Sequence, residues 1–95
     1  MTTHASYTVA FKPGFFKDIK KLPRDVRERL DKIIGMIQSD PFAVSSKKLV
    51  GHAQLYRYRL GDYRLVYYLD TEQRKVLFLL MAHRKEVYRE LEKMG

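Results

Sequence analysis

The 95-residue sequence contains no cysteine and no long apolar run. Without cysteine the chain cannot form disulfides or thiolate metal sites. The longest purely apolar stretch, Val76 to Ala82, is too short to span a bilayer. The first residues also lack a basic segment followed by an apolar one, so nothing in them directs export. We therefore expect a cytoplasmic protein without a membrane partner.

Several familiar kinds of active site also lack support in the sequence. There is no glycine-rich phosphate loop, no Ser-His-Asp arrangement and no acidic pair of glycosidase character. His4 and His52 stand in predicted loops, without the spacing or carboxylate partners of a metal site. Nucleoside triphosphate and acyl-transfer chemistry are therefore not indicated, and we expect no metal or other cofactor.

What the sequence has in excess is positive charge. Nineteen lysines and arginines against eleven acidic residues give a formal net charge of +8. A surface of this charge attracts phosphate polyanions at long range. The total alone is equally compatible with a merely solvated basic surface, so the placement of the charges has to decide.

The N-terminal part of the chain predicts a strand and two helices. Tyr7 to Phe11 is a short β-rich segment closed by Pro13-Gly14, after which apolar residues recur at helical spacing. Pro23 can open a second helix at its first turn, and Asp40-Pro41 ends it. Almost nothing joins the helices, so we expect an antiparallel hairpin whose apolar stripes pack on a sheet. These stripes are Phe15, Phe16, Ile19 and Leu22, then Val26, Leu30, Ile33, Ile34 and Ile37.

Alternation from Leu55 to Leu60 and again from Tyr63 to Leu69 predicts a β-hairpin. Gly61-Asp62 suits a two-residue type II′ turn, which places Leu60 opposite Tyr63. By the same register Arg59 lies opposite Arg64, Tyr58 opposite Leu65 and Tyr56 opposite Tyr67. One face belongs to the core and carries Tyr56, Tyr58, Leu60, Tyr63, Leu65, Tyr67 and Leu69. The other carries Arg57, Arg59, Arg64, Val66 and Tyr68.

The remaining segments complete a single domain over residues 1–95. Phe42 to Gln54 is expected to be a crossing loop with Lys47 and Lys48 exposed. Val76 to Ala82 predicts a central strand covered on both faces, and a short helix with Val87, Tyr88, Leu91 and Met94 on one face follows. The order strand, helix, helix, three strands, helix gives an α+β fold. Its mostly antiparallel four-stranded sheet carries the helical hairpin on one face.

The arginines on the predicted open face are the main functional signal. Placing Arg59 across from Arg64, with Arg57 on the same face, sets like charges side by side at a cost in stability. Guanidinium groups grip phosphate oxygens bidentately and stay charged, so phosphate binding is their natural use. The alternative is that Glu86 or Glu90 of the last helix neutralises the cluster through structural salt bridges.

Three residues near the C-terminus are further candidates. Arg84 follows the buried strand and could add a fourth positive group, or else face solvent at the start of the helix. Tyr88 lies one helical turn later and can point at the same site, or else pack in the core. His83 is a potential general acid or base, although one histidine ending an apolar strand is more often a packing residue.

In combination, these residues resemble the RelE/ParE toxin superfamily over nearly the whole chain. The matching residues are Leu49-x-Gly51, Tyr56, Arg59-Leu60-Gly61-Asp62-Tyr63-Arg64-Leu65-Val66-Tyr67 and His83-Arg84-x-x-Val87-Tyr88. Lys17-Asp18 to Leu22-Pro23 fits the first helix of the superfamily. The RelE branch implies the toxin of a type II toxin-antitoxin system, held silent by a RelB-type antitoxin. Such a toxin enters the ribosomal A site and cuts messenger RNA there without metal, which inhibits translation.

The resemblance also implies roles for individual residues. By position, Arg57 and Arg59 match the basic pair before the turn, Arg64 the arginine after it, and Arg84 and Tyr88 the C-terminal pair. These five are the expected catalytic residues, with RNA-binding roles for Lys47, Lys48 and His83. The expected reaction is attack of the RNA 2′-hydroxyl on its own phosphate, leaving a 2′,3′-cyclic phosphate.

One feature departs from the best-known members, which carry lysines at the positions of Arg57 and Arg59. Arginine does not readily release a proton near neutral pH, so the candidates for proton transfer are Tyr88 and, in its place, His83. Tyr88 could also stack on a base. Two other functions remain open: a ParE-like inhibitor of DNA gyrase, and a family member that binds RNA or an antitoxin without catalysis.

Overall fold

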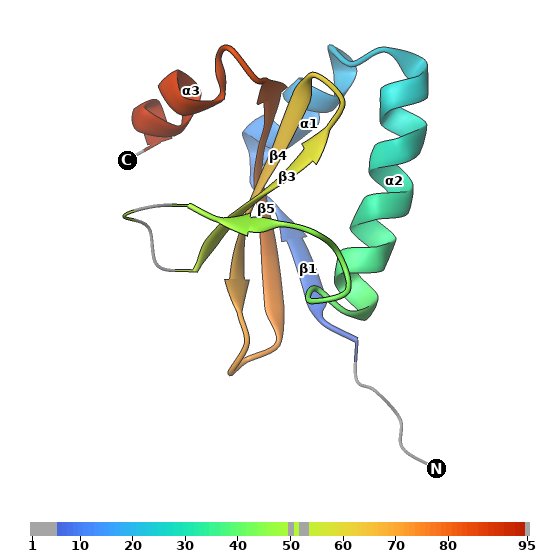
Figure 1. Ribbon diagram of the computed structural model, residues 1–95, viewed down its shortest axis with the longest axis vertical. Helices are drawn as coiled ribbons and strands as arrows, with labels where there is room; N and C mark the ends of the chain where they lie inside the picture. The colour runs from blue at the N-terminus through green and yellow to red at the C-terminus, as the bar shows by residue number, and fades with distance from the viewer. Residues whose placement is uncertain (1–5, 50, 52–53, 95) are drawn as a thin grey trace.

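The computed structural model describes residues 6–49, 51 and 54–94. The elements in chain order are β1 (Thr8–Phe11), α1 (Pro13–Lys20), α2 (Arg24–Ser39), β2 (Lys47–Lys48), β3 (Leu55–Leu60), β4 (Tyr63–Asp70), β5 (Lys75–His83) and α3 (Val87–Met94). They form one sheet in the order β1-β5-β4-β3-β2, in which β1 runs parallel to β5 and every other pair is antiparallel (Figure 1). The predicted α+β class is confirmed, and the elements that were predicted occur in the expected order.

The predicted number of strands was wrong, because the sheet has a fifth strand within the segment expected to be a loop. Lys47 and Lys48 form β2, paired with Arg57 and Tyr56 of β3. Two residues are too few to show a periodic pattern, so only the pairing with β3 defines this strand. It also fixes the position of two lysines that the sequence placed only on an exposed loop.

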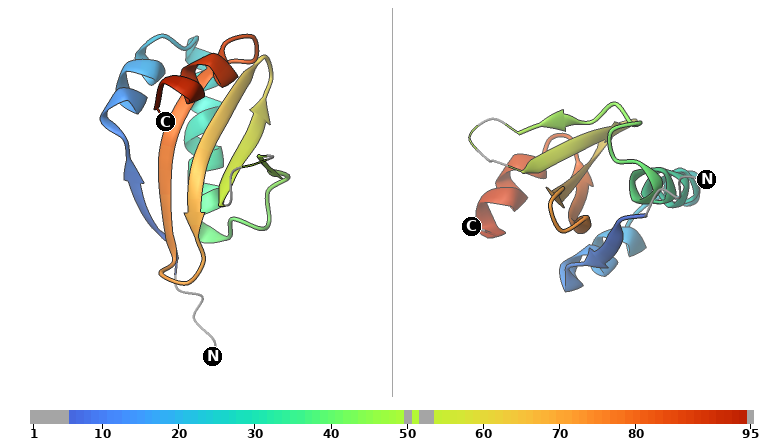
Figure 2. Two further views of the ribbon diagram at one scale, coloured as in Figure 1. Left: turned by 90° about the vertical axis from the view of Figure 1, so that its left-hand side faces the viewer. Right: turned by 90° about the horizontal axis from the view of Figure 1, so that it is seen from below.

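Helices α1 and α2 cover one face of the sheet, and α3 lies on the other (Figure 2). The apolar stripes of α1 and α2 pack against the sheet in the main core, where Phe15, Leu30 and Ile37 are fully buried. Phe16 is the exception, because it was predicted to belong to the first stripe but is 53% exposed. A smaller cluster under α3 combines Val87 with Leu80 and other residues of the sheet. Since α3 has only eight residues, much of this second face stays uncovered. Within the described ranges no helix is long and apolar enough to cross a membrane.

The hairpin of β3 and β4 has the predicted register. Leu60 pairs with Tyr63 and Arg59 with Arg64, and the pairing continues to Tyr56 and Tyr67. Gly61 has a φ of +60°, the positive value that the first central position of a type II′ turn requires. The predicted core face is confirmed as well, since its leucines and Tyr67 lie in the main core with the other tyrosines packed against it.

Asp18 attaches α1 to the neighbouring strand. Its Oδ2 accepts a hydrogen bond of 3.1 Å from the backbone N–H of Met81. Partial burial raises the pKa of this carboxyl above its ordinary value, which the hydrogen bond and the charge of Lys21 only partly oppose. The ionised form is therefore disfavoured in the native state. The native protein should lose stability as the pH rises through the range in which Asp18 ionises.

We expect Asp18→Asn to raise the thermal unfolding midpoint slightly at pH 7, because the amide oxygen can still accept from Met81 without a partly buried charge. At about pH 3, where the native carboxyl is protonated, the advantage should vanish. Thermal unfolding of both proteins at the two pH values tests this. A lower midpoint for the variant at neutral pH would show that the carboxylate charge stabilises the fold.

Candidate functional site

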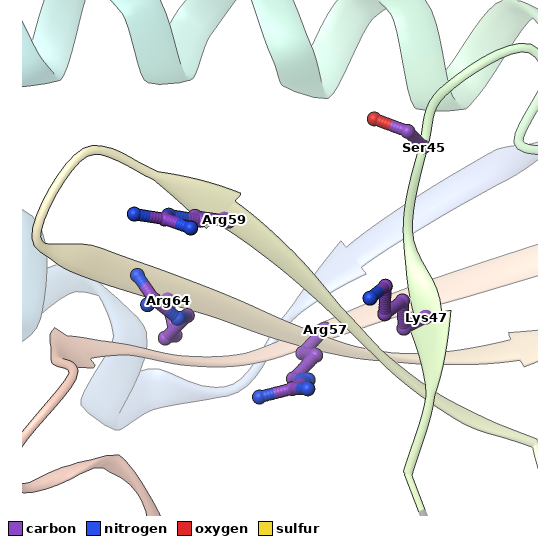
Figure 3. Close-up of a pocket in the computed structure, with 5 residues that line it drawn as sticks. All are labelled: Ser45, Lys47, Arg57, Arg59 and Arg64. Carbon is purple, nitrogen blue, oxygen red and sulfur yellow. The ribbon is translucent and has the colours of Figure 1, made fainter.

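The arginine trio lies on the sheet face opposite α1 and α2. Arg57 and Arg59 project from β3, and Arg64 projects from β4 directly across from Arg59. The close-up in Figure 3 shows their side chains beside a cavity of about 150 Å³ between the hairpin and the segment that contains β2. The residues lining this cavity are Ser45, Lys47, Arg57, Arg59 and Arg64.

Arg64 is the centre of the positive charge. Its Nη1 donates to the backbone carbonyls of Gly61 at 3.0 Å and Tyr63 at 2.9 Å, which fixes the guanidinium beside the turn. Nε and Nη2 form no hydrogen bond within the described part of the chain and remain available to a ligand. Desolvation lowers the pKa of Arg64, and the charges of Arg59, Arg57 and Arg84 lower it further. Arg64 nevertheless stays cationic at neutral pH, so it is suited to electrostatic stabilisation.

Arg84 reaches the same region from the end of β5. Its backbone N–H donates to the carbonyl of Asp62 at 2.7 Å, and its Nε lies 3.7 Å from Asp62 Oδ1. Both side chains of this ion pair are largely exposed, so the pair contributes little to stability but orients Arg84 toward the turn. The Arg84 side chain thus lies at the turn beside which the guanidinium of Arg64 is held.

Tyr88 joins the cluster from α3. Its Oη accepts a hydrogen bond of 2.7 Å from Nη1 of Arg57. The side chain is 48% exposed, so Tyr88 is not a core residue, whereas Val87 beside it is buried. Because the phenol oxygen accepts this bond, its own hydrogen is free to be donated to a ligand.

The acidic residues proposed as an alternative do not neutralise the cluster. Glu90 pairs with Lys93 at 3.1 Å on the exposed side of α3. Glu86 and Glu90 line a different cavity, next to Asp18 and His83. Among the described residues, the only carboxylate paired with one of the four arginines is Asp62. The face therefore keeps an excess of positive charge.

Two residues expected to bind RNA lie elsewhere. His83 pairs with Tyr63 in the sheet, and its ring meets the tyrosine ring edge-on at a centroid distance of 5.7 Å. Both side chains lie on the sheet face that α1 and α2 cover, opposite the arginines. Its Nδ1 accepts a hydrogen bond of 3.2 Å from the backbone N–H of Lys85. Lys48 lies opposite Tyr56, whose ring stacks on Tyr67 in the main core, so it also faces away from the arginines.

Lys47 and Ser45 are at the arginine cavity because of their neighbour Ser46. Tyr67 lies in the main core, and its hydroxyl donates a hydrogen bond to Ser46 Oγ. In an extended segment successive side chains alternate between faces, so Ser45 and Lys47 point the other way. Sequence reasoning missed Ser45, since a serine in an aperiodic segment carries no signal of its own.

Metal ligands do not gather anywhere in the parts of the chain that are described: no group of three or more histidine, aspartate and glutamate side chains could hold an ion there. The charged groups at the site are guanidinium and ammonium groups, which bind anions. The arrangement can grip phosphate oxygens and stabilise negative charge that develops on them.

Comparison with known proteins agrees with this geometry. The family model described as ParE toxin of type II toxin-antitoxin system, parDE, matches residues 9–88. The chain belongs to the RelE/ParE toxin superfamily. Among curated members of the superfamily, toxin RelE3 of Methanocaldococcus jannaschii is 31% identical over 84 residues, with 84% of this chain and 93% of that protein covered. Toxin RelG of Mycobacterium tuberculosis is 32% identical over 84 residues, with 87% and 97% covered.

The fold agrees with solved structures of RelE toxins. RelE from the archaeal RelE-RelB complex of Pyrococcus horikoshii superimposes with a TM-score of 0.73 at 26% identity, covering 83% of this chain and 96% of that one. The superfamily member described here is therefore RelE-like in both sequence and fold.

Proposed function

We propose that this RelE-like toxin is a metal-independent endoribonuclease that cuts messenger RNA in the ribosomal A site and so inhibits translation. The observation that carries the proposal is the convergence of Arg57, Arg59, Arg64, Arg84 and Tyr88 on one sheet face. Like-charged residues in this arrangement reduce stability, and a phosphodiester is the ligand that they fit. Kinship with curated RelE toxins supports the same function.

In the proposed reaction the RNA 2′-oxygen attacks the adjacent phosphorus while the proton of the 2′-hydroxyl passes to water. The bond from phosphorus to the 5′-oxygen breaks, leaving a 2′,3′-cyclic phosphate and a 5′-hydroxyl that takes up a proton. Arg64 and Arg84 stabilise the charge that develops on the phosphate oxygens. Tyr88 is held by Arg57 with its hydrogen free, so it can protonate the departing 5′-oxygen.

Primer extension on a defined message in a translating extract tests the proposal. Wild-type toxin that has been treated with EDTA and then freed of it should still produce cuts at A-site codons, and these cuts should be absent from ribosome-free RNA. Both Arg64→Ala and Arg84→Ala should abolish the cuts. Arg24→Ala is the matched control, because Arg24 is an exposed arginine on α2 that pairs only with Glu28 among the described residues. Uncut message with wild type would overturn the proposal.

A second candidate is inhibition of DNA gyrase, because the family model that matches is the one for ParE toxins. A supercoiling assay with purified gyrase separates the two functions. Inhibited supercoiling together with an intact message would favour the ParE-like function. Uninhibited supercoiling with A-site cuts would favour the nuclease.

A RelB-type antitoxin is the partner we propose. The structurally similar RelE of Pyrococcus horikoshii was solved as a complex with RelB. A net charge of +8 with an uncovered arginine face favours an acidic protein that places carboxylates over the site. We expect the toxin to co-purify with this acidic partner. High salt should weaken the binding, because it screens the attraction between the carboxylates and the arginines.

His83 is expected to contribute little to cleavage, because its ring lies against Tyr63 on the opposite face from the arginines. His83→Ala should retain the cleavage rate within about 3-fold, since general acid or base groups contribute far more, about 100-fold or above. The same primer-extension assay measures this. A loss of cleavage rate close to that of Arg64→Ala would show that His83 is a catalytic residue.

A further inference from the structure

Asp62 places a negative charge beside the arginines of the site. It is the second residue of the turn between β3 and β4, and its side chain is 72% exposed. A carboxylate at the rim of an anion-binding face repels phosphate, so it weakens the attraction on which RNA binding depends. The turn does not require this charge either, because asparagine or serine after Gly61 suits such a turn equally well. The charge of Asp62 is therefore best explained by the group that it contacts.

That group is the side chain of Arg84. The backbone N–H of Arg84 donates to the carbonyl of Asp62 at 2.7 Å, one step beyond the last pair of the ladder between β4 and β5. Ala82 pairs with Arg64, and Arg84 lies two residues after Ala82. A strand period of two therefore directs the Arg84 side chain to the face of Arg64. Asp62 and Arg84 thus form an oppositely charged pair across the two strands, with Nε 3.7 Å from Oδ1.

The turn holds the two neighbouring arginines in different ways. Arg64 donates to the backbone carbonyls of Gly61 and Tyr63, which any residue in this conformation would offer. The guanidinium of Arg84 is 55% exposed as part of its side chain and has no partner except the Asp62 carboxylate in the described part of the chain. Without that carboxylate, nothing described here would keep the Arg84 guanidinium from turning into solvent.

We infer that Asp62 is a positioning residue, whose carboxylate holds the Arg84 guanidinium at the turn beside Arg64. This role rests on the proposed function, in which Arg84 stabilises the charge that develops on the phosphate. Asp62 itself touches neither the phosphate nor the reacting atoms. Because a misplacement of about 1 Å can lower a rate about 100-fold, loosening one exposed side chain should lower it less, by about 10-fold.

Removing the carboxylate should change binding and catalysis in opposite directions. Asp62→Asn keeps the backbone carbonyl and suits the turn, but it adds one positive charge to the site. At low salt, the toxin concentration that gives half of the maximal cleavage rate should therefore fall by about 2-fold. The maximal rate itself should fall by about 10-fold, because Arg84 is no longer held in place. Cleavage on programmed ribosomes over a range of toxin concentrations gives both quantities.

Asp31→Asn is the matched control. It removes the same charge from an exposed position on α2, where Asp31 forms no hydrogen bond or ion pair with any described residue. Its maximal rate should equal that of wild type. Asp62→Glu restores a carboxylate and should recover most of the rate that Asp62→Asn loses. An undiminished maximal rate for Asp62→Asn would overturn the positioning role.

NMR of the free toxin tests the positioning without any cleavage. The order parameter of an arginine Nε–Hε group reports how firmly its guanidinium is held on the ps–ns timescale. For Arg84 it should fall in Asp62→Asn, recover in Asp62→Glu and stay at the wild-type value in Asp31→Asn. An order parameter that Asp62→Asn leaves unchanged would also overturn the role. A restrained Arg84 in a toxin that does not cut message would reject the nuclease while keeping the contact between Asp62 and Arg84.

Discussion

Replacing Arg64 with alanine should lower the rate of message cleavage by about 100-fold or more, the effect of removing one donor to a developing oxyanion. Arg64 is held at the centre of the site by the carbonyls of Gly61 and Tyr63, with Nε and Nη2 available to the phosphate. No other side chain of the cluster has this fixed position between β3 and β5. The remaining arginines should therefore not compensate.

The same substitution should not destabilise the fold. Arg64 lies among Arg57, Arg59 and Arg84, whose charges disfavour its own positive charge. Its removal relieves this repulsion, so we expect an unchanged or slightly higher thermal midpoint at low salt. Quantified primer extension and thermal unfolding measure the two effects, with Arg24→Ala as the reference. A large fall in the midpoint would mean that the lost activity reflects unfolding.

Tyr88→Phe should reduce cleavage about 100-fold with little effect on folding, as expected for loss of a group that transfers a proton in the transition state. The hydroxyl makes an exposed hydrogen bond to Arg57, and the ring is 48% exposed. Neither feature contributes much to stability. Single-turnover cleavage on programmed ribosomes measures the rate of the chemical step directly.

The control for Tyr88→Phe is Tyr68→Phe. Tyr68 also has a hydroxyl in an exposed hydrogen bond, at 2.9 Å to Oε1 of Gln54, but it takes no part in the arginine cluster. Its loss should leave cleavage nearly unchanged. Wild-type activity of Tyr88→Phe combined with an inactive Tyr88→Ala would show that the ring stacks on a base and the hydroxyl transfers no proton.

Local patterns were sufficient to predict most of the fold. Alternation through β3 and β4 assigned every side chain of the hairpin to a face, and Gly61 fixed the register at which Arg59 meets Arg64. The prolines at positions 13, 23 and 41 correctly separated the helices from their neighbours. β2 was missed because a two-residue strand has no pattern and exists only through its partner.

The candidate site was predictable only in part. Arg57, Arg59 and Arg64 share one face as a direct consequence of a strand period of two. Their meeting with Tyr88 required the docking of α3, which depends on apolar contacts of Val87 across the sheet. The approach of Ser45 likewise required the bond between Ser46 and Tyr67, residues 21 positions apart.

The sequence by itself thus determined the hairpin and its arginines, because turn chemistry and alternation act between near neighbours. Only the tertiary structure decided on which face His83 lies. β5 is apolar almost throughout, so it shows no alternation, and its pairing with β4 shifts by one residue between Val66 and Tyr67. Phe78 and Met81 consequently both face the main core although they are three residues apart. The residue of β5 that this shift skips is Leu79. Each side chain of β5 after Leu79 therefore points to the opposite face from the one that regular alternation would give, and His83 points away from the arginines.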